Sequence, residues 1–248
     1  LDIKTTYVLP VTIKSVEGIG VLQSAKTYYY VFRGASLINV VCNISRNRAY
    51  PDFKNDSKFN NLTENTMEIL FKANSFPNTL NTLMGIESNY LLRIGDATIP
   101  NNQLQVATSV NNCTSADLQL ESGKWYHVAV AFNKGNVKVY INGVEKLSGS
   151  TGKSSVSLGA KHTNEEDGSR CFWVGYSYKD DRYFDGVVSE VRIWNRALTA
   201  EEIQATNHFY TIEPESEGLI AYWKFDEGSG TVAKDYSVSG YDLTIEKE

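Results

Sequence analysis

The strongest constraint on the fold is the spacing of turn residues between short runs that alternate apolar and polar side chains. Residues 126–132 alternate strictly, with Tyr, Val, Val and Phe on one side and the small Ala129 and Ala131 on the other. This period-two pattern predicts a central strand that is covered on both faces. Asn142-Gly143 follows the strand expected at 137–141. It is a strong hairpin signal, because a type I′ turn needs positive φ at both central residues.

Further strands are expected along most of the chain. They fall at residues 66–72, 90–94, 103–108, 172–178, 187–194 and 219–225. The sequence predicts one helix, which begins after Thr199, has Glu202 in a capping box and Ile203 in the core, and ends near His208. Many strands with one short helix predict an all-β sandwich, and the absence of strand–helix alternation excludes a nucleotide-binding α/β fold.

The first residues form a unit of their own in this interpretation. Residues 7–16 alternate, and residues 27–32 are β-branched or aromatic, so the two runs predict a hairpin. A hairpin alone has too few neighbours for stability. We therefore place a boundary near Gly34, with the hairpin of an upstream domain at 1–33 and the main domain at 34–248.

Charge and apolar content exclude several classes of protein. The 248 residues hold 24 Lys and Arg against 29 Asp and Glu, and the net charge is -5. A nucleic-acid-binding protein usually carries a basic surplus, which this chain lacks. The apolar runs are too short for a membrane-spanning helix. No targeting signal is recognisable in the chain.

Three cysteines, Cys42, Cys113 and Cys171, are too few for a disulfide scaffold. None lies in a Cys-x-x-Cys pair, which argues against a zinc knuckle. We interpret them as buried or incidental thiols. A Cys113–Cys171 bridge in an oxidising compartment stays open.

Three sequence blocks resemble the laminin-G-like, concanavalin A-like domain family. They read GKWYHVAV at 123–130 with VKVYING at 137–143, then FWVG at 172–175, then FDGVVSEVRIWNRALT at 184–199. The resemblance extends from about Gly34 to the C-terminus, and it implies a jelly roll of two antiparallel sheets. Family members often carry Asp where this chain has Ser189, so the resemblance does not carry a metal-binding or turn-forming role over to this position. AYWKFDEGSG at 221–230 resembles the usual opening of such a domain. It either starts a truncated second copy or folds back as a strand of the same sandwich.

A second, shorter resemblance concerns the N-terminal piece. YVLPVTI at 7–13 and TYYYV at 27–31 resemble the tail of a small β-sandwich domain of unknown function. That domain precedes laminin-G-like domains in surface lipoproteins of glycan-foraging gut bacteria. The resemblance implies an extracellular or outer-membrane location and a role in binding a polysaccharide or other glycan.

The sequence gives little support for catalysis. β-Glucanases of the same superfamily need Glu-x-Asp-x-x-Glu on one strand, so that period two puts the carboxylates on one face. Here Glu190 is followed by Arg192 at the Asp position. We expect a binding module and no enzyme. A protein-binding adhesion module and a glycoside hydrolase with a non-standard site remain as alternatives.

The candidate ligand-binding residues are aromatic or amide side chains near predicted loops. Sugars stack on aromatic faces and take hydrogen bonds from amides and carboxylates. Loops on a rigid sandwich often carry binding sites. The candidates are Tyr176, Tyr178, Asp180 and Tyr183 in one loop, Asn89 and Tyr90 at the start of the strand expected at 90–94, and Trp173, which alternates away from its neighbours.

No cofactor is expected, although a structural calcium ion stays open. Calcium needs six to eight oxygen ligands, and Asp226, Asp235 and Asp242 lie in the end segment that would supply some of them. His127 is interpreted as a packing residue of an inner strand.

Overall fold

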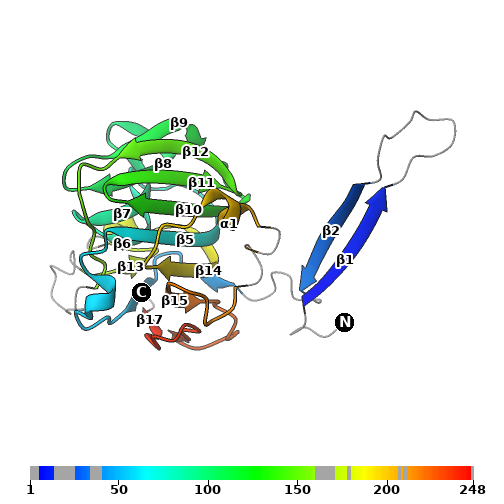
Figure 1. The fold of residues 1–248 in the computed structure, drawn as a ribbon. Helices are drawn as coiled ribbons and strands as arrows, with labels where there is room; N and C mark the ends of the chain where they lie inside the picture. The colour runs from blue at the N-terminus through cyan, green and yellow to red at the C-terminus, as the bar shows by residue number, and fades with distance from the viewer. Residues whose placement is uncertain are drawn as a thin grey trace.

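The computed structural model describes residues 6–13, 26–33, 41–159, 171–177, 180–205, 208 and 212–246. Two antiparallel sheets stack face to face in it (Figure 1). This arrangement confirms the predicted all-β sandwich. Among the described residues, no helix has the length and apolar character that crossing a membrane would require.

One sheet has seven strands. Its order is β12 (Val144–Ser150), β11 (Asn136–Ile141), β10 (Trp125–Asn133), β5 (Glu64–Ala73), β14 (Gly186–Trp194) and β15 (Leu219–Trp223), with β3 (Cys42–Asn43) paired to β14. Because β15 pairs with β14, the segment at 221–230 folds back into the same sandwich, which settles the alternative left open by the sequence.

The other sheet has eight strands. Its order is β16 (Val232–Ala233), β17 (Leu243–Glu246), β4 (Arg48–Pro51), β13 (Trp173–Val174), β6 (Asn81–Ile86), β7 (Tyr90–Asp96), β8 (Ile99–Thr108) and β9 (Cys113–Gln119). Short 3₁₀ helices lie at η1 (Ser57–Phe59) and η3 (Asp180–Arg182).

The main core fills the space between the two sheets. Val128, Val130 and Phe132 of β10 meet Met67, Ile69 and Phe71 of β5 there, as their alternation predicts. Ala129 and Ala131 lie on the opposite face, in a second cluster with Leu198 and Ile203 at α1 (Ala200–Gln204). The seven-stranded sheet is therefore covered on both faces, as the small alanines predict.

The helix begins as predicted and ends earlier. Thr199 accepts a hydrogen bond from the Glu202 backbone N–H, and Glu202 accepts one from the Thr199 backbone, which completes the capping box. The prediction that the helix ends near His208 is wrong, because Ala205 is already extended at φ -55 and ψ 137. Likewise the strand expected at 172–178 is only β13, since Gly175 turns the chain at φ +75.

β14 contains an irregularity that the alternation pattern did not predict. Val188 pairs with Phe71 and Glu190 pairs with Leu70, so Ser189 is an extra residue in the strand. Such a bulge reverses which side chains face the core. Val191 and Ile193 are in the main core, and Glu190 and Arg192 lie on the other face.

The N-terminal strands β1 (Thr6–Ile13) and β2 (Lys26–Arg33) form the predicted hairpin, in the register Tyr7 with Phe32. They make a separate two-stranded sheet, and within the described part of the chain neither pairs with the sandwich. The proposed boundary at Gly34 lies outside the described residues and stays a prediction.

Cys42, Cys113 and Cys171 are all free thiols in this structure. Cys113 belongs to the main core, whereas Cys171 belongs to a different cluster. The structure therefore contains no Cys113–Cys171 bridge.

Candidate functional site

The outer face of the eight-stranded sheet carries a group of aromatic side chains. On β4, Ala49 faces the core, so alternation places Arg48 and Tyr50 on the outer face. On β13, Val174 faces the core and Trp173 faces outward. Trp173 and Tyr176 form a cluster there, with Tyr50 and Tyr183 packed against it. We call these four side chains the aromatic cluster.

Edge-to-face contacts hold the aromatic cluster together. The Trp173 ring centroid lies 5.2 Å from that of Tyr50 and 5.2 Å from that of Tyr176. Two guanidinium groups lie over its tyrosines: Arg48 is 4.8 Å from the Tyr176 ring centroid, and Arg46 is 5.1 Å from that of Tyr183. Cation–π attraction therefore orders the arginines along with the rings.

The four rings differ in what a ligand could touch. Trp173 and Tyr176 are each 5% exposed, whereas Tyr50 and Tyr183 are half-buried. The Tyr50 hydroxyl donates a 2.7 Å hydrogen bond to Glu246 on the neighbouring β17. Burial and this carboxylate raise the pKa of Tyr50 to about 12, so the hydroxyl keeps its proton. The buried rings of Trp173 and Tyr176 therefore support the more exposed rings of Tyr50 and Tyr183.

A polar strip continues from the aromatic cluster along β6 and β7. Glu87, just after β6, forms an ion pair with Arg182 at 3.0 Å. It also accepts a longer hydrogen bond of 3.4 Å from the Ser177 hydroxyl. Arg93 on β7 lies 4.0 Å from Glu87 and donates to Gln105 at 2.8 Å. The loop that carries Tyr183 is thus fixed to the β6–β7 turn.

The two residues of the Glu87–Arg182 ion pair line two different pockets. Arg182 lines one of about 390 Å³, together with Asn78, Asp96 and Asp181. Glu87 lines the other, of about 510 Å³, which we call the amide pocket; its further polar lining includes Asn55, Asn60, Asn89, Ser88 and Lys153. The ion pair therefore connects the linings of the two pockets.

The structure brings together some of the predicted ligand-binding residues. Trp173, Tyr176 and Tyr183 share the aromatic cluster, and Asn89 lines the amide pocket. Tyr90 is a correction: it is 0% exposed in the main core, with its ring 5.7 Å from that of Phe132, so it cannot contact a ligand.

For two other candidates, the structure does not describe the side chain. Tyr178 lies outside the described residues. Asp180 begins the 3₁₀ helix η3, but its side chain is likewise outside the described part.

The sequence analysis missed several residues of this face, above all Tyr50 and Arg48. The alternation of Arg48 and Tyr50 about Ala49 was a readable signal for an outward-facing pair. Their neighbour Glu246 is 196 residues away along the chain, and β17 meets β4 only through tertiary pairing. That contact has no local signal.

The predicted strand with Glu190 offers no accessible carboxylate. Glu190 is 6% exposed and paired with Arg192, and the Tyr222 hydroxyl donates to it at 3.1 Å. Arg192 is 1% exposed. These side chains lie on the seven-stranded sheet, away from the aromatic cluster. His127 is 4% exposed in β10, with its Nε2 3.2 Å from a carboxylate oxygen of Glu68, so its interpretation as a packing residue stays a prediction.

Asp235 of the end segment organises a turn. Its carboxylate accepts hydrogen bonds from the backbone N–H groups of Tyr222, Ser237 and Tyr241 and from the Ser237 hydroxyl. Asp242 in turn accepts from the Asp235 N–H at 2.9 Å. A calcium ion held by Asp226, Asp235 and Asp242 stays a prediction.

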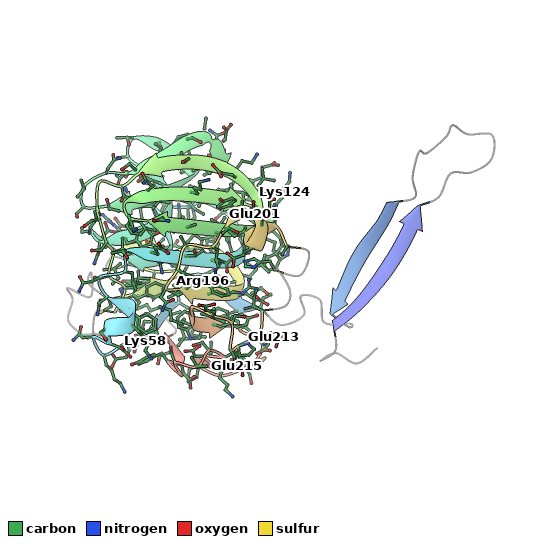
Figure 2. The ribbon with its side chains drawn as sticks, viewed as in Figure 1. Lys58, Lys124, Arg196, Glu201, Glu213 and Glu215 are labelled. Carbon is green, nitrogen blue, oxygen red and sulfur yellow. The ribbon has the colours of Figure 1, made fainter. Side chains whose placement is uncertain are left out.

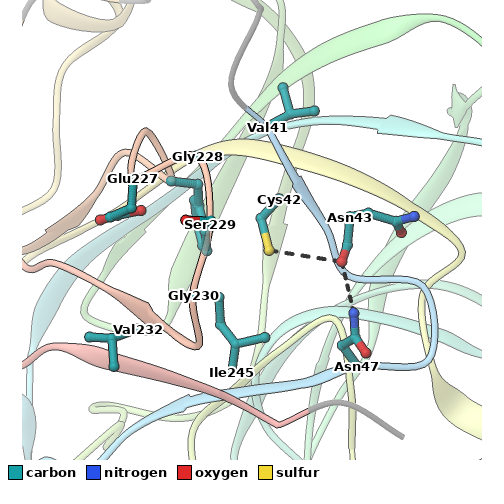
Figure 3. A pocket seen from close by; sticks show the side chains of 11 residues that line it. Val41, Cys42, Asn43, Asn47, Glu227, Gly228, Ser229, Gly230, Val232 and Ile245 are labelled. Atoms are coloured by element: carbon teal, nitrogen blue, oxygen red, sulfur yellow. Dashed lines mark hydrogen bonds between the residues drawn. The ribbon is translucent and has the colours of Figure 1, made fainter.

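A further pocket, of about 350 Å³, lies where β3 enters the sandwich (Figure 3). Cys42 and Asn43 line one side, and Gly228, Ser229 and Gly230 line the other. The glycine-rich segment forms a bend and supplies few polar side chains. This pocket offers less recognition chemistry than the amide pocket.

Exposed charges are spread around the sandwich. Lys58, Lys124, Glu201, Glu213 and Glu215 lie on its surface, and Figure 2 shows them distributed around its periphery. Both signs are present, which agrees with the small net charge of -5.

Comparisons with known proteins agree with this architecture. A family model described as the concanavalin A-like lectin/glucanases superfamily matches residues 47–204. The crystal structure of a candidate carbohydrate-binding protein from Bacteroides ovatus is similar, with a TM-score of 0.70 and 26% identity, covering 100% of this chain and 69% of that one.

Two further solved structures resemble the chain more distantly. One is domain 4 of the GH43 extracellular arabinanase AbnA from Geobacillus stearothermophilus, at 19% identity, with 80% of this chain and 86% of that chain covered and a TM-score of 0.47. The other is a heptameric SAP-like pentraxin from Limulus polyphemus, at 14% identity, with 99% and 96% covered and a TM-score of 0.47. No curated protein matches the chain.

Proposed function

Because the chain belongs to the concanavalin A-like lectin/glucanases superfamily, we propose that it is a non-catalytic carbohydrate-binding module. Its binding surface is the aromatic cluster together with the amide pocket. The single observation that carries this proposal is the position of Tyr50 and Tyr183. Both rings are half-buried and pack against Trp173 and Tyr176, with Tyr50 coming from β4 and Tyr183 from the loop before β14.

The chemistry of these side chains suits a sugar. Pyranose rings present C–H patches that pack on aromatic faces, and their hydroxyls need donors and acceptors at fixed angles. Tyr50 and Tyr183 offer aromatic surface, and Arg48 offers donors. Asn55 and Asn89 in the amide pocket offer both donors and acceptors. Trp173 and Tyr176 are buried beneath this surface and support it by packing against Tyr50 and Tyr183.

The arrangement of carboxylates supports a role without hydrolysis. A retaining glycosidase needs two carboxyl groups about 5 Å apart, flanking the bond that is cut. Glu68 and Glu190 are brought near each other through Arg192, and they are 1% and 6% exposed. On the proposed binding surface, Glu87 is paired with Arg182 and Glu246 accepts from Tyr50.

The cellular context belongs to the same proposal. We place the protein outside the cell or on the outer-membrane surface of a glycan-foraging bacterium. The resemblance of residues 7–31 to a domain of surface lipoproteins supports this location. So does the likeness to a Bacteroides ovatus protein. The module then captures a polysaccharide at that surface.

A glycan array and affinity gels containing soluble polysaccharides test the proposal. We expect the full chain to be retained by at least one glycan. Retention should weaken markedly in Tyr50→Ala and Tyr183→Ala, because each removes aromatic contact area. Tyr236→Ala is the matched control, since Tyr236 is another half-buried tyrosine but packs on the seven-stranded sheet.

Several results would count against the proposal. Absence of any retained glycan would remove carbohydrate binding, and capture of a protein partner without glycan competition would favour an adhesion module instead. Equal loss in Tyr236→Ala would move the site away from the aromatic cluster. Release of reducing sugar from any polysaccharide would show an enzyme.

A further inference from the structure

Two imidazoles and one carboxylate cluster on the face of the seven-stranded sheet that points away from the main core, far from the proposed glycan surface. Glu68 comes from β5, His127 from β10, and His208 from the segment after α1. Their ligand atoms all lie within 4.8 Å of one another. The three residues are 1%, 4% and 6% exposed. Three elements far apart in the sequence therefore bring two imidazoles and one carboxylate to a single buried point.

The two oxygens of Glu68 face different partners. Oε1 lies 3.2 Å from Nε2 of His127 and 2.5 Å from Nε2 of His208. Oε2 accepts a 2.7 Å hydrogen bond from the Trp194 indole N–H. Oε1 of Glu68 thus faces the two imidazoles, and the hydrogen bond from Trp194 to Oε2 fixes the orientation of the carboxylate. This is how outer groups orient a ligand that binds a metal through one oxygen.

His208 is also oriented from outside the cluster. Its backbone carbonyl accepts a 2.9 Å hydrogen bond from Arg192, and its ring stacks at 6.4 Å on Trp194. Two imidazoles and one carboxylate form a ligand set used for zinc sites that keep an open fourth position. Ligand atoms about 2.0–2.1 Å from zinc in a tetrahedron stand roughly 3.3 Å apart. The Glu68–His127 spacing already matches, and the Glu68–His208 spacing would have to widen by about 0.8 Å.

The charges around the cluster bear on a cation. Arg192 lies 3.7 Å from Oε2 of Glu68 and opposes a positive ion there. However, Arg192 also pairs with Glu190, so the two carboxylates and one guanidinium carry a net charge of about -1 when both histidines are neutral. A buried negative charge without compensation is costly. A divalent metal ion supplies positive charge at this point and changes the net charge of the group from about -1 to about +1.

We propose that Glu68, His127 and His208 bind one divalent transition-metal ion, of which Zn²⁺ is the best-suited example. In that state each imidazole presents its Nε2 lone pair to the ion and carries its proton on Nδ1. The ion ties β5, β10 and the segment after α1 together. This site is independent of carbohydrate binding.

Titration of the full chain with Zn²⁺ by calorimetry, after treatment with a chelator and at pH 7.5, tests the proposal. We expect one ion per chain, and binding should weaken toward acid pH, because metal ligands must be deprotonated to bind the ion. His208→Ala should abolish the binding. His162→Ala is the matched control, since it removes the third histidine of the chain and should bind as the wild type does.

A measurement on the wild-type chain avoids any folding defect of the variant. With ¹⁵N-labelled histidine, Zn²⁺ should shift the Nε2 resonances of two of the three imidazoles. Absence of such shifts would overturn the proposal, as would Zn²⁺ binding that persists in folded His208→Ala or disappears in His162→Ala.

Discussion

At the scale of single residues, Asp185 shows how one carboxylate can join three strands. It lies in the turn before β14 and accepts hydrogen bonds from Ser45, Asn74 and Ser75. Ser45 follows β3, and Asn74 and Ser75 follow β5. Gly186 completes the junction by donating its N–H to the Ser45 hydroxyl. The FDG sequence at 184–186 is therefore a structural feature of the sandwich edge.

We expect Asp185→Ala to destabilise the fold by about 1–3 kcal/mol, because three donors lose a charged acceptor. Burial raises the pKa of Asp185, but hydrogen bonds from Ser75, Ser45 and Asn74 outweigh it and leave the pKa below its usual value. A carboxyl whose folded pKa is depressed stabilises the fold above its unfolded pKa of about 4, and that contribution is lost as the pH falls through the folded pKa.

Urea denaturation between pH 3 and pH 7 measures this effect. The difference between wild type and Asp185→Ala should be largest near pH 7 and should shrink toward pH 3. The exposed Asp117 on β9 provides the control, and Asp117→Ala should stay within about 0.5 kcal/mol of wild type. A difference that does not change with pH would show that the carboxylate charge plays no part.

At the scale of elements, tight turns and one bulge decide which side chains face the core. The bulge at Ser189 places Glu190 and Arg192 on the face of the seven-stranded sheet that carries Glu68 and His127. Without it, the period of two would put Glu190 on the same side as the buried Val188. The buried polar cluster therefore depends on one inserted residue in β14.

The β6–β7 hairpin depends on the missing side chain of Gly85. Its φ is +123°, and a Cβ there would lie 2.3 Å from the Tyr90 carbonyl oxygen. We expect Gly85→Ala to destabilise the protein by at least about 2 kcal/mol, from backbone strain together with overpacking. Gly123 is the matched control, because its φ is +78° and a Cβ there would meet no atom within 4 Å. Thermal unfolding followed by circular dichroism should show a smaller loss, of about 1 kcal/mol, for Gly123→Ala.

Helix α1 depends on its cap, since it has only five residues. We expect Thr199→Ala to cost about 1 kcal/mol, because the Glu202 N–H loses its acceptor. Thr199→Ser keeps the hydroxyl and should unfold close to wild type in the same denaturation experiment. If both variants lose the same stability, the methyl group of Thr199 matters and the cap does not.

At the scale of the whole molecule, the sandwich and the N-terminal hairpin are separate sheets. The main core of the sandwich draws on both of its sheets, whereas a two-stranded hairpin is at best marginally stable alone. We expect a chain of residues 34–248 to fold with an unchanged melting temperature and unchanged glycan retention. Calorimetry of both lengths checks this. Aggregation or a lower melting temperature of the shorter chain would show that the hairpin packs on the sandwich.

The candidate site was partly predictable for a local reason. Trp173, Tyr176 and Tyr183 are close in sequence, and the alternation of Trp173 with Phe172 and Val174 indicated which way it faces. Tyr90 was predicted to bind a ligand, but it begins β7 and its ring lies in the main core. Adjacent positions at a strand end can face either side, and only the register with β8 decides which.

The sequence alone determined the fold class, the order of most strands, the N-terminal hairpin and the capped helix. These depend on periodicity, turn chemistry and capping, which act over a few residues. The tertiary structure decided which strands are neighbours, and therefore where distant side chains meet. Glu246 reaches Tyr50, and His208 reaches Glu68, only because sheet pairing and packing bring them together. Local pattern cannot encode such contacts, since their geometry is set by the register and bulges of many strands at once.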